Sequence, residues 1–114
     1  MDISKLEESA YIPDWRDNQD EQEPIEIVLQ PLTGGQRVRC MATRIDGKGE
    51  TQIEPDLEKA CTYGIKTIKN LSADGMPITT GNQLLQCTAP DIDMLIREVG
   101  MEIIIRNKRP DLKN

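Results

Sequence analysis

The chain has 114 residues, a formal net charge of −6, few aromatic side chains and no histidine. This length fits one domain of ordinary size, and the acidic balance disfavours nucleic-acid binding because phosphate backbones repel it. No apolar run is as long as a membrane span and the first residues lack a signal-peptide pattern, so we expect a cytoplasmic protein without membrane contact.

The N-terminal stretch of residues 1–24 carries the whole net charge, with eight acidic and two basic side chains. This segment is acidic and has few core-forming residues. It therefore does not bury enough apolar surface to offset the conformational entropy that is lost when a segment becomes ordered. We therefore expect an acidic, partly disordered N-terminal arm over residues 1–24, with at most a turn of helix over residues 4–10. Residues 25–114 then form a single, mainly helical domain.

Within this arm, Tyr11, Ile12 and Trp15 form a compact amphipathic patch that holds the only tryptophan of the chain. Tryptophan and tyrosine concentrate binding energy at protein interfaces. Two interpretations stay open: Trp15 anchors the arm in a groove of a partner, or it folds back and fills a gap in its own aromatic-poor core. Tyr11, Ile12 and Trp15 are candidate partner-binding residues on the first interpretation.

Alternating side chains over residues 25–30 predict a short strand that ends at Pro31. Thr33 and Gln36 have the spacing of a capping box, and the apolar residues from 38 to 45 follow helical spacing. These signals favour a helix to about residue 45. Residues 38–42 also alternate, so a strand that forms a hairpin with residues 25–30 is the alternative.

Residues 46–49 are expected to form a loop, after which Pro55 is placed in the first turn of a helix over residues 55–63. The β-branched run that follows predicts an extended segment over about residues 65–71. This segment is suited to pair with residues 25–30, which gives a short two-stranded β element. Residues 73–77 have the composition of a turn.

Two further capping boxes are predicted, at Thr80 and at Thr88. The second leads into the clearest helix of the chain, which Pro110 ends. Its apolar stripe is either core or part of a self-association face, and Leu95, Val99 and Ile103 are the candidate partner-binding residues on it. The expected fold class is α+β.

The sequence offers little reactive chemistry. Without histidine, the commonest general base and zinc ligand is missing. The glycine-containing loops match no phosphate-binding motif. The cysteines are odd in number and widely spaced, so we expect Cys40, Cys61 and Cys87 to be reduced thiols. We expect a protein that is not an enzyme, with no catalytic residue, cofactor or metal.

The order of several motifs resembles the small tail-assembly chaperones of long-tailed, siphovirus-type bacteriophages and prophages. An aromatic-Pro-acid-Trp motif precedes an acidic spacer, a strand that runs into Pro-Leu-Thr-Gly, and a helix with Cys-Thr-Tyr-Gly-Ile near its end. An Asn-Leu-x-x-Asp-Gly-x-Pro-Ile stretch and a final helix with a Leu-x-Asn tail follow. These motifs occupy residues 11–18, 31–34, 61–65, 70–78 and 112–114.

The resemblance implies a non-catalytic protein that oligomerises and coats the tape-measure protein during tail-tube assembly. A longer product, often made by frameshifting in this family, is thought to recruit the tail-tube subunit. The expected partners are therefore the tape-measure protein, the tail-tube subunit and further copies of the chain. The alternatives are a structural virion component, such as a head–tail connector or tube-associated protein, and an acidic regulatory or inhibitory protein-binding module.

Overall fold

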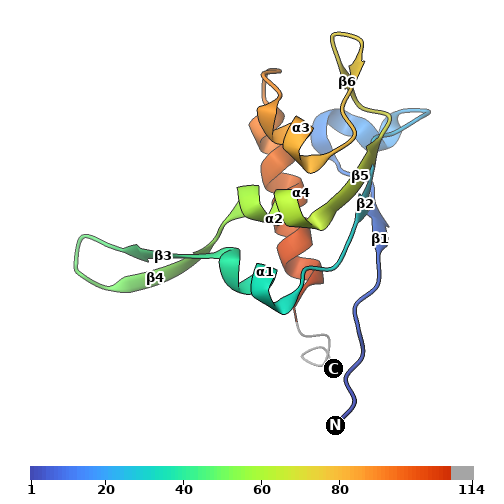
Figure 1. The fold of residues 1–114 in the computed structure, drawn as a ribbon. Helices are drawn as coiled ribbons and strands as arrows, with labels where there is room; N and C mark the ends of the chain where they lie inside the picture. The colour runs from blue at the N-terminus through green and yellow to red at the C-terminus, as the bar shows by residue number, and fades with distance from the viewer. Residues whose placement is uncertain (109–114) are drawn as a thin grey trace.

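The computed structural model describes residues 1–108, which form an α+β fold as expected from the sequence. Figure 1 shows a body of helices and a small sheet, from which one long hairpin projects. In chain order the elements are β1 (Ser9–Tyr11), η1 (Trp15–Asp20), β2 (Glu26–Leu29), α1 (Gly34–Arg39), β3 (Met41–Ile45), β4 (Thr51–Pro55), α2 (Leu57–Gly64), β5 (Ile65–Lys69), β6 (Ser72–Ala73), β7 (Met76–Pro77), α3 (Gly81–Gln86) and α4 (Ile92–Arg106).

The central sheet has three antiparallel strands in the order β1-β2-β5. The pairing of β2 with β5 confirms the predicted two-stranded element, to which β1 adds a strand. The register shifts at Val28 and Leu29, so that Leu29 faces Ile65 while Val28 faces Thr67. This bulge leaves Lys66 as an extra residue, and it explains how Ile65 and Ile68 both reach the core despite their odd spacing.

The strand β1 corrects the expectation of a partly disordered arm with a helical turn over residues 4–10. Ser9, Ala10 and Tyr11 pair with Leu29, Val28 and Ile27 of β2. The following residues form η1, a 3-10 turn in which Arg16 and Asp17 have left-handed backbone angles. Composition indicated disorder, but backbone pairing and side-chain hydrogen bonds order this segment.

The core lies between the sheet and the helices. Its most buried side chains include Ile27 of β2, Leu84 of α3 and Leu95 of α4, and each such burial contributes about 1.5–3 kcal/mol. Helices α3 and α4 come very close to α2. A Cβ added at Gly100 would lie 2.9 Å from Cβ of Leu57, and one added at Gly81 would lie 2.5 Å from the carbonyl oxygen of Cys61.

Two of the three predicted capping boxes are confirmed, those at Thr33 and Thr80. The prediction at Thr88 is wrong: α4 begins after Asp91, whose side chain makes no capping hydrogen bond. The carboxylate of Asp91 is instead bound by Arg16 of the N-terminal segment. Gly100 lies inside α4 without breaking it. The predicted stop at Pro110 and the Leu-x-Asn tail lie outside the described residues.

The helix predicted to extend to residue 45 ends at Arg39, and Met41–Ile45 form β3. This strand pairs with β4, not with residues 25–30 as the alternative interpretation had it. The turn between the strands is held by Asp46, whose Oδ1 accepts the backbone N–H groups of Lys48 and Glu50 at 2.8 and 2.9 Å. Contrary to the prediction from the sequence, Pro55 ends β4 and is not in the first turn of a helix, because α2 begins at Leu57.

Candidate protein-interaction surfaces

The aromatic patch of the N-terminal segment lies on its own domain. The indole Nε1 of Trp15 donates to the carbonyl oxygen of Asp91 at 3.0 Å, and the half-buried ring packs against the core. The guanidinium of Arg16 stacks over this ring, 4.5 Å from its centroid. Of the two interpretations of Trp15, the structure shows the one in which it folds back. Ile12, the third member of the patch, is exposed.

Glu98 of α4 holds the segment where β1 ends. Its Oε2 accepts hydrogen bonds from the hydroxyl of Tyr11 at 2.5 Å and from the backbone N–H of Asp14 at 2.7 Å. Burial, together with the bond to Glu98 and its charge, raises the pKa of Tyr11 well above its usual range. Arg106, the last residue of α4, donates to the Ser9 hydroxyl at 2.7 Å.

Asp91 holds the segment at the other end of α4. Its carboxylate forms an ion pair with Arg16, whose Nη2 also donates to the carbonyl oxygen of Pro90 at 2.8 Å. The hydrogen bond from Arg16 lowers the pKa of Asp91. Asp91 has a left-handed backbone, with φ of 51°. Aspartate tolerates this conformation better than most residues, which fits its place at the start of the helix.

Asn18 has a structural role that the sequence did not predict. It is a buried polar side chain, and its amide closes the loop between Pro13 and Ile25. Its Nδ2 donates to the carbonyl oxygens of Pro13 and Ile25 at 2.9 and 3.1 Å, while its Oδ1 accepts the N–H of Ile25 at 2.7 Å. A lone asparagine in an acidic stretch carries no sequence signal for this role.

The candidate residues on α4 belong to the core. Leu95, Val99 and Ile103 are at most 1% exposed, so in this fold no partner reaches them. The structure thus places this stripe in the core, which is the alternative interpretation that the sequence left open. The structure does not bring them together with Tyr11, Ile12 and Trp15 in a single surface, because they lie on the buried side of the helix.

The opposite side of α4 carries a second apolar stripe that the sequence analysis missed. Met94, Met101 and Ile105 are between 41% and 54% exposed. They follow one another at i, i+7 and i+11, which places them along one line of the helix. A surface helix normally presents polar residues there, so this outer stripe is a candidate binding surface.

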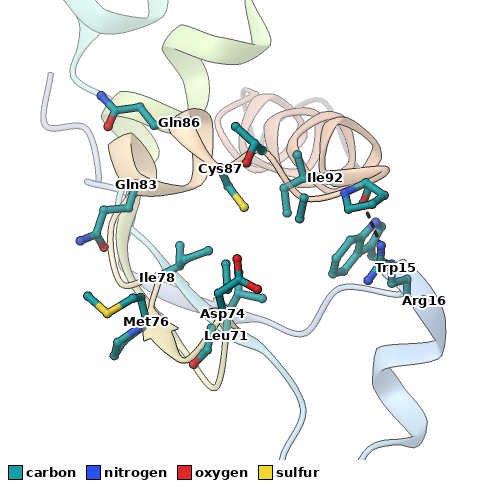
Figure 2. Close-up of a pocket in the computed structure, with 16 residues that line it drawn as sticks. Trp15, Arg16, Leu71, Asp74, Met76, Ile78, Gln83, Gln86, Cys87 and Ile92 are labelled. Atoms are coloured by element: carbon teal, nitrogen blue, oxygen red, sulfur yellow. Dashed lines mark hydrogen bonds between the residues drawn. The ribbon is translucent and has the colours of Figure 1, made fainter.

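An open cleft of about 640 Å³ lies between the β6–β7 hairpin, the α3–α4 connection and η1. Figure 2 shows Trp15 and Ile92 on one side of it, with Met76 and Gln83 on the opposite side. Cys87 also lines this cleft and is half-buried. The lining is mixed apolar and polar, which suits a protein side chain as well as it suits a small molecule.

The buried cysteines are poorly suited to reaction. Burial, with a smaller effect from neighbouring Cys40, raises the pKa of Cys61 to about 12, and burial likewise raises the pKa of Cys40. A thiol with a raised pKa is largely protonated near neutral pH and is a weak nucleophile. Within residues 1–108, no cluster of three or more acidic or cysteine side chains is arranged to hold a metal ion.

Comparison of the chain with protein families, curated proteins and solved structures finds no match. Over the part that the structure describes, no helix has the length and apolar character needed to cross a membrane.

Proposed function

We propose that the chain is a non-catalytic tail-assembly chaperone of a long-tailed bacteriophage. It acts in the host cytoplasm, where it self-associates and binds the tape-measure protein while the tail-tube subunit polymerises. The order of motifs along the sequence supports this assignment. The single structural observation that carries it is the exposed outer stripe of α4.

The outer stripe has the properties needed to hold a helical client. From Met94 to Ile105 it extends over about 17 Å of helix, at 1.5 Å per residue. A tape-measure protein is a long apolar helical chain, and a second helix packs along such a line at an axial separation of about 8–10 Å. Methionine side chains adapt to irregular partners, which suits one chaperone surface to successive segments of a long client.

A binding role also accounts for the chemistry of the chain. Histidine is absent from the sequence, and two of its three cysteines are buried with raised pKa values. The contact on α4 is short, so each copy binds weakly and releases its client readily. Many copies along one client then supply avidity that no single contact has.

The test is binding of the full chain to a helical tape-measure fragment encoded by the same phage. Met101→Glu places a charge in the outer stripe and is expected to weaken binding at least about tenfold, because the carboxylate must be desolvated against an apolar helix. Met76→Glu is the matched control, since Met76 is also exposed but belongs to β7. It is expected to leave the affinity unchanged.

Absence of any fragment that binds the unmodified chain would contradict the proposal. Loss of binding by Met76→Glu alone would move the client to the cleft lined by Trp15. Mass spectrometry of mature particles separates this function from that of a structural virion component, because an assembly chaperone is expected to be missing from them.

A further inference from the structure

We infer that the exposed face of the β3–β4 hairpin is a contact between two copies of this chain. This inference rests on the proposed function for its premise that copies associate. It assigns the face that joins two copies and the symmetry of the contact. The occupant is a second hairpin of the same sequence, packed face to face.

The register of the hairpin separates its side chains into two unlike faces. Residues directly opposite each other in an antiparallel pair share a face, as do residues two apart along a strand. The pairs on one face are Met41 with Pro55, Thr43 with Ile53 and Ile45 with Thr51. We call this set the ribbon face, and it carries no charged side chain.

The charges of the two strands lie on the opposite face. Arg44 pairs in register with Gln52 and forms an ion pair with Glu54, at 3.3 Å. The strands thus have the alternation of a sheet with one face against a core and one in water. The hairpin therefore has the sequence pattern of a strand pair with one buried face, although it projects away from the body of the molecule (Figure 1).

The ribbon face is nevertheless exposed in the single chain. Met41, Ile45 and Ile53 are 46%, 71% and 66% exposed, although strands usually turn such side chains inward. A two-stranded hairpin alone is at best marginally stable in water, and it needs a further apolar surface against it. A second copy is the partner available whenever the chain is made.

The order of side chains on the ribbon face is suited to twofold pairing. Apolar groups stand at both ends of the face, Met41 and Pro55 at the base and Ile45 near the turn, with Thr43 and Ile53 in the middle. A twofold axis through the middle pair places Ile45 of one copy over Met41 of the other, and Thr51 over Pro55. The first contact is apolar, the second adds only a hydroxyl, and no charge is buried, which suits an isologous interface.

The size of the contact sets its strength. Five residues of strand extend over about 17 Å, and two strands with their side chains are about 10 Å wide. This footprint is well below the roughly 800 Å² per partner of a stable complex, so the dimer is expected to be weak and concentration-dependent. Such reversibility suits a coat that must be removed.

The experiment is sedimentation velocity of the full chain over a wide range of concentrations, without any client. Ile53→Lys puts an ammonium in the ribbon face, whereas Gln52→Lys puts the same group on the opposite face of the same strand. The unmodified chain and Gln52→Lys are expected to dimerise alike. Ile53→Lys is expected to raise the dimer dissociation constant at least about tenfold, because its charge would be buried without a partner.

Crosslinking tests the symmetry independently of affinity. In a Cys87→Ser background, Thr43→Cys lies near the proposed axis and is expected to give disulfide-linked dimers with an added oxidant. Arg44→Cys, on the polar face, is the control and is expected to stay monomeric. Circular dichroism of each variant establishes that it folds.

An unmodified chain that remains monomeric at the highest concentration overturns the inference, as do equal dimerisation of the two lysine variants or equal crosslinking of the two cysteine variants. If Thr43→Cys is shielded from oxidation only when a helical fragment is added, the face belongs to the client, and this result also overturns the inference. Since no client is present, failure here leaves the α4 experiment standing. Failed client binding likewise leaves the dimer intact.

Discussion

The N-terminal segment of residues 9–20 and the β3–β4 hairpin are stabilised in opposite ways. The first has only three residues of strand, yet its side chains are bound along α4 by Glu98, Asp91 and Arg106. The second has five paired residues in each strand and a well-defined turn, yet its apolar side chains face outward. Regular backbone pairing and side-chain packing are therefore separate properties in this molecule.

The two regions differ in whether their order depends on distant parts of the chain. The N-terminal segment is acidic, and its order comes from specific hydrogen bonds to residues far along the sequence. The order of the hairpin comes from neighbouring residues, mainly the turn at Asp46. Substitutions in the first region should therefore lower global stability, whereas those in the second should chiefly change association.

The largest effect is expected at Asn18. Asn18→Ala removes three hydrogen bonds and leaves buried backbone groups of Pro13 and Ile25 without partners, so the free energy of unfolding should fall by about 2–3 kcal/mol. Urea denaturation measures this. The control Gln19→Ala removes one exposed bond and should change stability by less than about 0.5 kcal/mol. Equal effects would show that the loop is not held by Asn18.

A smaller loss is expected at Glu98. Glu98→Ala leaves the Tyr11 hydroxyl and the Asp14 N–H without their acceptor, and should cost about 1–2 kcal/mol. Glu54→Ala is the counterpart in the hairpin, where it breaks an exposed ion pair with Arg44. It should cost no more than about 0.5 kcal/mol in thermal unfolding. The reverse order would invalidate the comparison of the two regions.

The attachment of the N-terminal segment should depend on pH at both extremes. Arg16 lowers the pKa of Asp91. The contribution of the Asp91 carboxylate to folding stability is therefore complete above the usual aspartate pKa, and it is lost as the pH falls through the lowered value. Because the pKa of Tyr11 is raised, its contribution is complete below about pH 10 and declines above that.

Fluorescence of Trp15, the only tryptophan, reports both changes. Asp91→Asn should remove most of the acid response and leave the alkaline one. An unchanged acid response in Asp91→Asn would assign it to other carboxylates.

The smallest effect is expected on the ribbon face of the hairpin. Ile53→Thr keeps a β-branched side chain at an exposed position, so the stability of the dilute chain should change by less than about 0.5 kcal/mol. Chemical denaturation at low protein concentration measures it. A loss as large as that of Asn18→Ala would mean that this face is already covered in the monomer.

Much of the fold follows from local signals in the sequence. The capping boxes at Thr33 and Thr80 and the apolar stripe of α4 set three helices, and the alternation before Pro31 predicts β2. Each of these depends on residues that are close in sequence, where spacing fixes which side chains meet. The pairing of β2 with β5 was also expected, because both are short and β-branched.

The remaining elements depend on distant residues or on competing patterns. Residues 41–45 fit both helical and alternating spacing, and the partner strand β4 with the turn at Asp46 decides for a strand. Helix α4 begins after Asp91, not at the predicted cap Thr88, and Asp91 is held there by Arg16 and Trp15. Such contacts leave no local trace in the sequence.

The candidate surfaces were hard to predict for a related reason. On α4, both the stripe that contains Leu95 and the one that contains Met101 are apolar, and sequence spacing alone does not say which one faces inward. The presence of a stripe on each side was the available signal. Close packing of α4 at Gly100 against Leu57 of α2 decides which of the two is buried.

The unequal burial of the three cysteines has a practical use. Cys40 and Cys61 are buried with raised pKa values, whereas Cys87 lines the cleft that Trp15 also lines. A maleimide dye added near neutral pH should therefore label Cys87 first, without any mutation. The lone indole would quench such a dye, so detachment of the N-terminal segment, or entry of another polypeptide into the cleft, becomes visible as a change in emission from the natural chain.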